Sequence, residues 1–168
     1  MDEVGKPKVV TDAGPLIYLA LLERFHLFFD LFDQVWIPEA VHHEVVRQGR
    51  NMAGASETEI AVQTGRFRSA KAEDVIAVDA LLTELDRGEA EAIVVARESN
   101  IGRVLMDDRA ARRKAVGMGL SVTGTIGVLL LAQQMGTPID LRKALDRLIQ
   151  HNFWIAPKLY ERLTGARP

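Results

Sequence analysis

Short β-branched segments alternate with longer helical patterns along this chain, and this alternation restricts the fold more than any other feature of the sequence. The segments that read as strands lie at residues 8–12, 34–37, near 67, 103–108 and 121–124. Helical patterns follow at 15–24, 39–49, 89–99, 109–117, 125–136, 141–148 and 158–163. Strands that alternate with helices of this length favour βαβ units. We therefore predict an α/β fold with a central parallel sheet and helices on both faces.

Glycine and proline mark the limits of several predicted elements. Gly14 and Pro15 separate the first strand from the first helix, and Pro38 suits the first turn of the second helix. Gly49 is expected to end that helix. Residues 51–57 are small and polar and predict a loop, followed by a short helix to residue 63.

The composition limits the class of protein. The chain has 168 residues and shows no linker, so we expect one domain over residues 1–168. Cysteine is absent, which excludes thiolate chemistry and favours the cytoplasm. No apolar segment approaches the roughly 20 residues that span a bilayer, and the polar start of the chain is unlike a signal peptide. The formal charge of -2 means that a polyanion would need a local basic patch or metal ions.

Acidic residues follow two of the predicted strands. Asp12 ends the first strand, and Asp107 and Asp108 end the strand near residue 105. In a parallel sheet the carboxyl ends share one edge, where ligands bind, so these acids should converge. Carboxylates that lie close together repel unless a cation lies among them, and oxygen ligands suit Mg²⁺ or Mn²⁺. The alternative is that Asp12 serves a turn and that Asp107 or Asp108 caps the next helix.

Three glutamates could join this edge. Glu44 borders the apolar stripe of its helix, and a solvated surface position is its alternative interpretation. Glu89 and Glu91 lie in the first turn of their helix, where the helix dipole favours acids in any protein. His43 and Glu44 begin a zinc-protease pattern, but Arg47 replaces its second histidine, so that interpretation fails.

A basic cluster directly follows the second acidic strand end. It consists of Arg109, Arg112, Arg113 and Lys114. One interpretation is a patch that attracts phosphate groups to the acidic site, and the other is an ordinary solvated helix face. Aromatic residues that could stack on nucleic-acid bases are few.

Four motifs together resemble one protein family. The segments VVTDAGPLIYLA, IPEAVHHEVV, LDRGEAEAIVVARE and VLMDDRAARRKA are similar to those of PIN-domain nucleases, including VapC-like toxins of toxin–antitoxin systems. A PIN-like subgroup with DAGPLI, GEAEAI and VTGTIGVLL segments is especially similar. The resemblance implies a single PIN-like nuclease domain with four acids that bind one or two Mg²⁺ or Mn²⁺ ions.

The resemblance also implies roles for individual residues. Asp12, Glu44 and Asp107 take three of the four acidic positions, and the phrase AEAIVVA favours Glu91 over Glu89 for the remaining one. Asp107 and Asp108 are both candidates for the acidic position at the end of their strand, because the sequence reads MDDR at residues 106–109.

The function implied is a metal-dependent endoribonuclease that is the toxin of an antitoxin-controlled pair and forms a homodimer. The first alternative is a catalytically silent PIN-fold module that binds RNA or a partner protein. A receiver-type phosphotransfer protein built on Asp107 and Asp108 is a second alternative, but the lysine that it requires is not identifiable.

Overall fold

The computed structural model describes residues 5–168, so the first four residues of the polar start of the chain lie outside that part. The chain divides into two compact units, Met1–Thr125 and Ile126–Pro168. The first unit contains the sheet and the acidic residues of interest, and the second consists of helices and their connections.

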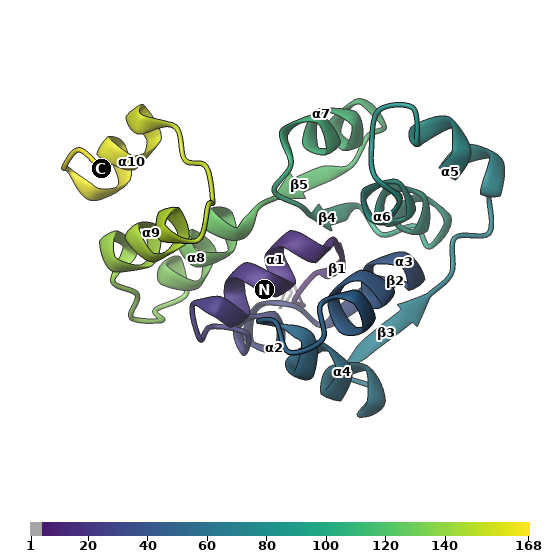
Figure 1. Cartoon of the computed structure of the whole chain (residues 1–168), viewed down its shortest axis with the longest axis horizontal. Coiled ribbons are helices and arrows are strands. Elements are labelled where there is room, and N and C mark those ends of the chain that lie inside the picture. The colour runs from purple at the N-terminus through teal and green to yellow at the C-terminus, as the bar shows by residue number, and fades with distance from the viewer. Residues whose placement is uncertain (1–4) are drawn as a thin grey trace. The chain divides into compact units, whose positions relative to one another are not determined.

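The sheet is parallel throughout, as predicted (Figure 1). Its strands are β1 Lys8–Thr11, β2 Gln34–Pro38, β3 Phe67–Ala70, β4 Arg103–Leu105 and β5 Ser121–Thr123, in the order β3-β2-β1-β4-β5. The chain adds β2 and β3 on one side of β1 and then β4 and β5 on the other side. The order therefore reverses between β1 and β4, and such a switch point is where α/β proteins bind ligands.

The first unit surrounds this sheet with short helices. They are α1 Ala13–Leu21, α2 Leu27–Leu31, α3 Glu39–His42, α4 Ala55–Gln63, α5 Val75–Leu81, α6 Arg87–Glu98 and α7 Arg109–Gly117. A π-helical segment, η1 His43–Gln48, continues α3 directly.

Several sequence predictions need correction here. Pro38 ends β2 with an extended backbone instead of opening the helix that follows it. The predicted loop at residues 51–57 is wrong from Ala55 onward, because α4 begins there. Helices α2 and α5 were not predicted, since each is too short to show a clear apolar repeat.

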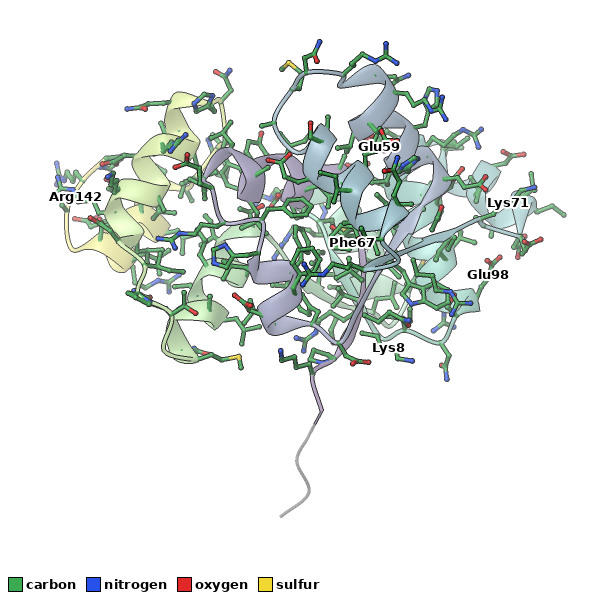
Figure 2. All side chains as sticks on the ribbon, turned by 90° about the horizontal axis from the view of Figure 1, so that it is seen from below. Lys8, Glu59, Phe67, Lys71, Glu98 and Arg142 are labelled. Carbon is green, nitrogen blue, oxygen red and sulfur yellow. The ribbon has the colours of Figure 1, made fainter. Side chains whose placement is uncertain are left out.

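Helices cover both faces of the sheet, because alternate strand residues point to opposite sides. Val10, Val104 and Met106 belong to a buried core that includes residues of α5, α6 and α7. On the other face Phe67, labelled in Figure 2, packs against Phe28 with ring centroids 5.4 Å apart. The fold class predicted from the sequence is therefore confirmed.

The strand β3 forms one edge of the sheet and carries arginines around it. The Arg66 guanidinium lies 3.6 Å from the centroid of the Phe29 ring. The Arg68 guanidinium lies 4.3 Å from the centroid of the Trp36 ring. Both cations therefore stack on aromatic faces.

The second unit holds most of α8 Thr125–Gln134, together with α9 Leu141–Gln150 and α10 Pro157–Thr164. Leu145 and Leu148, from the predicted apolar stripe, are fully buried. The hydroxyl of buried Tyr160 donates a hydrogen bond to Asp146 and so joins α10 to α9. None of the helices in the described part of the chain is both long and apolar enough to span a bilayer.

Candidate functional site

Asp12 lies at the switch point, between the end of β1 and the start of α1. Its backbone N–H donates to the Leu105 carbonyl of β4 at 2.9 Å, which holds the two strand ends together. The residue is only 7% exposed. Burial raises the pKa of the Asp12 carboxyl well above its ordinary value, and the charges of Asp86, Glu89 and Glu44 raise it further. The backbone N–H of Ala13 opposes the shift without cancelling it.

Gly88 of α6 makes room for two of these carboxylates. A Cβ added at Gly88 would lie 3.2 Å from Glu44 Oε2 and 3.4 Å from Asp12 Oδ1. Glu44 Oε2 and Asp12 Oδ1 come from distant parts of the chain, yet both border the same small space. This space exists because Gly88 has no side chain. Any larger residue at position 88 would fill that space.

Glu44 reaches the site from the π-helical segment η1. Partial burial raises the pKa of the Glu44 carboxyl, and the charge of Asp86 contributes in the same direction. Gly49 ends the segment, and a Cβ there would lie 2.6 Å from the Val45 carbonyl oxygen. The π-helical segment therefore ends at a position where a side chain would clash with the backbone, so glycine is needed there. Segments of π-helix occur often at functional sites.

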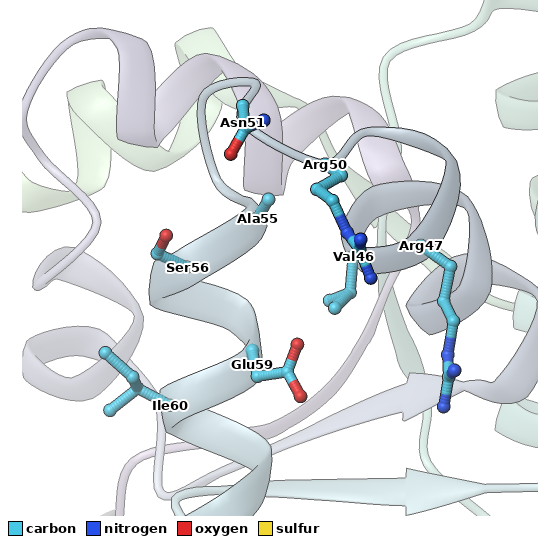
Figure 3. A pocket seen from close by; sticks show the side chains of 8 residues that line it. All are labelled: Val46, Arg47, Arg50, Asn51, Ala55, Ser56, Glu59 and Ile60. Carbon is cyan, nitrogen blue, oxygen red and sulfur yellow. The ribbon is translucent and has the colours of Figure 1, made fainter.

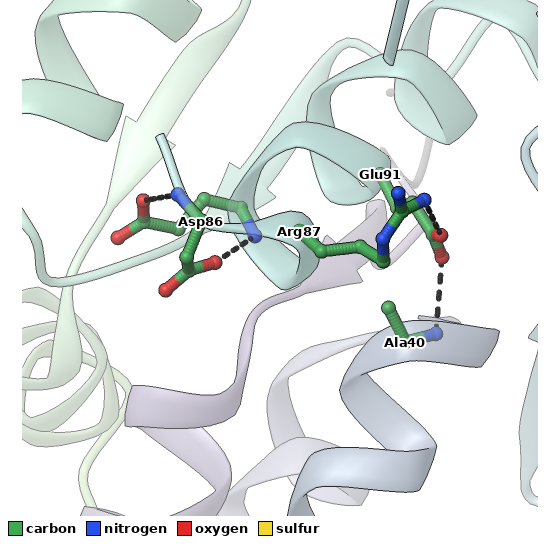
Figure 4. Close-up of polar contacts among 5 residues, drawn as sticks. Ala40, Asp86, Arg87 and Glu91 are labelled. Atoms are coloured by element: carbon green, nitrogen blue, oxygen red, sulfur yellow. Dashed lines mark hydrogen bonds and ion pairs between the residues drawn. The ribbon is translucent and has the colours of Figure 1, made fainter. Parts of the chain in front are cut away.

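Asp86 and Glu89 form two reciprocal hydrogen bonds at the start of α6 (Figure 4). The Asp86 N–H donates to Glu89 Oε2 at 3.1 Å, and the Glu89 N–H donates to Asp86 Oδ1 at 2.8 Å. Burial raises the pKa of Glu89 to about 7, with further contributions from Asp86, Asp108 and Glu44. This reciprocal capping box orients Glu89 toward the other acids.

Glu91 lies elsewhere, although its sequence context favoured it over Glu89. Its Oε2 accepts a hydrogen bond of 3.0 Å from the Ala40 N–H at the start of α3, and its Oε1 lies 3.6 Å from Arg87 Nη1 (Figure 4). Residues 89 and 91 are about 200° apart around a helix, so they face different surroundings. The structure therefore brings Asp12, Glu44 and Glu89 together without Glu91.

Asp86 was not a predicted site residue. The signal that could have identified it is the D-x-x-E spacing of Asp86 and Glu89, which is typical of a capping box at a helix start.

Asp107, at the end of β4, has different surroundings. Its Oδ1 accepts a hydrogen bond from the Thr125 N–H and its Oδ2 one from the Thr125 hydroxyl, each at 2.7 Å. Burial raises the pKa of Asp107, whereas the bonds from Thr125 and the charge of Arg112 lower it. A Cβ at Gly124 would lie 2.8 Å from Asp107 Oδ1, so glycine is required for this contact. Both oxygens of Asp107 are thus already hydrogen-bonded.

Asp108 caps helix α7. Its Oδ1 accepts hydrogen bonds from the backbone N–H groups of Ala110 at 2.8 Å and Ala111 at 2.9 Å. This is the capping alternative that the sequence left open, and the charge of Asp108 still reaches Glu89.

The basic cluster divides into two pairs. Arg112 Nη1 donates to the Met106 carbonyl at 3.0 Å, and Lys114 Nζ lies 2.7 Å from Glu84 Oε1. Arg109 and Arg113 are exposed, and neither forms an ion pair with another described residue. Arg109 and Arg113 are thus the exposed members of the cluster, and both are open to a phosphate.

The acids around Gly88 suit a divalent cation in chemistry and charge. Asp12, Glu44 and Glu89 supply hard oxygen ligands, and within residues 5–168 no lysine or arginine forms an ion pair with them. The space beside Gly88 adds room at two of the carboxylates. As the side chains lie, the described residues include no group of three acids or histidines close enough to hold a metal ion. Closer approach of the carboxylates would be needed for coordination.

The comparison with protein families finds the PIN domain, whose sequence profile matches residues 8–166, in both compact units. No curated protein matches the chain. PIN domains are generally nucleases, and the match covers nearly the whole chain. The protein described here belongs to the PIN domain family.

Proposed function

We propose that this protein is a metal-dependent ribonuclease that hydrolyses phosphodiester bonds of RNA. One observation carries the proposal: Asp12 and Glu44 border the space beside Gly88, burial and the charges of neighbouring acids raise the pKa values of Asp12, Glu44 and Glu89, and no lysine or arginine within residues 5–168 forms an ion pair with these three acids. Such an arrangement is costly for a fold unless a cation compensates it. It lies at the switch point of the sheet, where a substrate has access.

We assign Asp12, Glu44 and Glu89 as the residues that would hold Mg²⁺ or Mn²⁺. A bound divalent ion lowers the pKa of water and neutralises charge on a phosphate group. Asp86 orients Glu89 through the capping box and leaves Glu89 Oε1 outside that pair of bonds. Glu91 and Asp108 have structural roles in this proposal, because their carboxylates bind backbone N–H groups. Asp107 holds Thr125 and is not needed as a ligand.

Arg109 and Arg113 are the residues we propose to attract the RNA backbone. Both are exposed at the helix that follows the acidic strand end. Arg112 and Lys114, predicted with them, are engaged by Met106 and Glu84. Their contribution to RNA binding is therefore smaller in this proposal.

The motif resemblance extends the proposal to biology. On the DAGPLI, GEAEAI and VTGTIGVLL segments we propose a single VapC-like nuclease domain over the whole chain. It would be the toxin of a toxin–antitoxin pair, and it would form a homodimer whose acidic site a small antitoxin covers.

Two observations favour a second function. Each oxygen of Asp107 accepts a hydrogen bond from Thr125, and no three acids in the described chain are close enough to hold an ion. These features would suit a PIN-fold module that binds RNA or a protein without cleaving it.

The test is cleavage of single-stranded RNA with Mg²⁺ or Mn²⁺, compared with EDTA. Asp12→Asn should reduce the rate more than about a hundredfold, since even groups outside the first ligand shell typically contribute about 10–100-fold. Asp33→Asn is the matched control, because Asp33 is an exposed aspartate. Undiminished cleavage in EDTA, or a fully active Asp12→Asn variant, would contradict the nuclease proposal. RNA binding without cleavage by the parent protein would identify the silent module.

A further inference from the structure

A cavity of about 430 Å³ lies between η1, α4 and the turn that joins them (Figure 3). Its size is in the range of small-molecule sites. Its apolar lining residues are Val46, Ala55 and Ile60, of which Val46 and Ala55 are largely buried. Ile60 is 58% exposed, which leaves apolar area there open to a flat hydrophobic group.

Two arginines give this cavity a positive side. Arg47 lies in η1 and Arg50 in the following turn, and both line the cavity. Neither forms an ion pair with any residue in the described part of the chain. Glu59 is the acid of the lining, and its Oε1 accepts a hydrogen bond from Gln63 Nε2 at 3.0 Å. A guanidinium group suits a phosphate, which it can bind through several N–H donors at once.

The backbone that shapes the cavity is closely packed. Gly54 has a φ of +89°, and a Cβ there would lie 2.9 Å from the Leu16 carbonyl oxygen of α1. Asn51, at the rim, also has a positive φ, of 68°. At the other end of the turn, Gly49 packs equally tightly against Val45. Arg50 and Asn51 therefore extend from a turn that is held at both ends.

The cavity is close in sequence to the acidic site but separate from it. Glu44 and Arg47 belong to the same short helical segment, about one turn apart. Glu44 reaches toward Gly88, whereas Val46, Arg47 and Arg50 border α4. The acidic site and the cavity are thus bordered by residues of one short helical segment.

We propose that this cavity binds one nucleotide of an RNA strand, with the phosphate on Arg47 and Arg50 and the base against Val46, Ala55 and Ile60. The inference rests on the proposed function for its substrate class, RNA. It does not require that the protein cleave the bound strand. Binding in EDTA therefore tests it apart from nuclease activity.

The experiment measures binding of a fluorescent single-stranded dodecauridylate in EDTA over a series of salt concentrations. Replacing both Arg47 and Arg50 by alanine should weaken binding about tenfold. It should also make the slope of log K against log salt shallower by about 0.7, the value for one phosphate of a single strand. Glu59→Gln should strengthen binding, since it removes a negative charge from the cavity.

Control variants and competitors separate the possible ligands. Arg162→Ala with Arg167→Ala removes the same charge from exposed positions elsewhere and should leave binding nearly unchanged. Uridine monophosphate should compete better than uridine, and the difference should vanish in the Arg47 and Arg50 variant.

Three results would overturn the inference. The first is equal RNA affinity of the parent and the double variant. The second is an effect of the double variant on the mononucleotide alone, which would indicate a free nucleotide as the ligand. The third is competition by a polyglutamate peptide as strong as that by RNA, which would indicate an acidic protein segment.

Discussion

The ends of β1 and β4 are neighbours in the sheet, yet Asp12 and Asp107 at these ends interact with different kinds of groups. Burial raises the pKa of Asp12, and the charges of Asp86, Glu89 and Glu44 raise it further. Around Asp107 two hydrogen bonds from Thr125 and the charge of Arg112 lower the pKa that burial raises. Residue type and position in the fold are the same, so the difference lies in the groups that each carboxylate contacts.

This comparison separates two uses of a buried acid. A carboxylate whose oxygens are hydrogen-bonded stabilises the chain around it, because its charge is compensated within the protein. A carboxylate that faces other carboxylates stores repulsion, which a proton or a metal ion can relieve. We therefore expect changes near Asp107 to act on stability and changes near Gly88 to act on ion binding.

The largest expected effect is a dependence of stability on pH in metal-free protein. The folded state raises the pKa of Glu89 to about 7 from its ordinary 4.5, so it holds a proton that the unfolded chain releases between these values. The free energy of unfolding should therefore fall by about 3 kcal/mol as the pH rises through this window. The raised pKa values of Asp12 and Glu44 act in the same direction. Urea unfolding in EDTA between pH 5 and pH 8 measures this dependence of the free energy of unfolding on pH.

Two variants sharpen this result. Glu89→Gln should remove the part of the dependence that Glu89 contributes, whereas Glu73→Gln, at an exposed glutamate, should retain the full dependence. Stability that stays constant or rises over the window would show that the folded state does not raise the pKa of Glu89.

A smaller effect is expected at the other strand end. Thr125→Val removes the hydroxyl that donates to Asp107 Oδ2, and the loss of a hydrogen bond to a charged group should cost about 2 kcal/mol. Thr11→Val is the matched control, because the buried Thr11 hydroxyl donates to a neutral carbonyl, that of Asp12. That change should cost about 1 kcal/mol or less. Stabilisation by Mn²⁺ should be the same in both variants, and its loss in Thr125→Val would make Asp107 part of the ion site.

The smallest effect concerns the space beside Gly88. Gly88→Ala would place a methyl group 3.2 Å from Glu44 Oε2, so the Glu44 carboxylate must move away. We expect the stabilisation by Mn²⁺, read from thermal unfolding, to decrease by about 1 kcal/mol through weaker binding. Gly117→Ala, in α7, has nothing within 4 Å of its new methyl group and should leave the Mn²⁺ effect unchanged. Equal Mn²⁺ effects in the two variants would separate Gly88 from the ion site.

The parallel sheet and the position of Asp12 could be predicted from sequence, because both depend on local patterns. A β-branched run that ends in an acid before Gly14 and Pro15 predicts a strand, a turn and an acidic edge. The helix at residues 109–117 was predicted with the bounds that α7 has in the structure. Strong periodicity and clear breakers make such elements independent of distant contacts.

The choice between Glu89 and Glu91 could not be made in this way. Both glutamates lie near the start of one helix, and which of them faces Asp12 depends on how α6 is rotated against β1. The hydrogen-bond donor to Asp107 could not be predicted from the sequence either, because Thr125 lies 18 residues further along the chain. The π-helical turn at His43–Gln48 has the residue types of an ordinary helix, so its sequence does not reveal it.

The stacked arginines at β3 have a consequence for the behaviour of the folded chain in concentrated solution. An edge strand presents unpaired backbone groups that can pair with another molecule, and charged side chains along the edge oppose that pairing. Arg68 is exposed within β3, Arg66 precedes it and Lys71 follows it, while the opposite edge, β5, has only three residues. Both edges are thus protected against strand-to-strand aggregation, one by positive charge and the other by its short length.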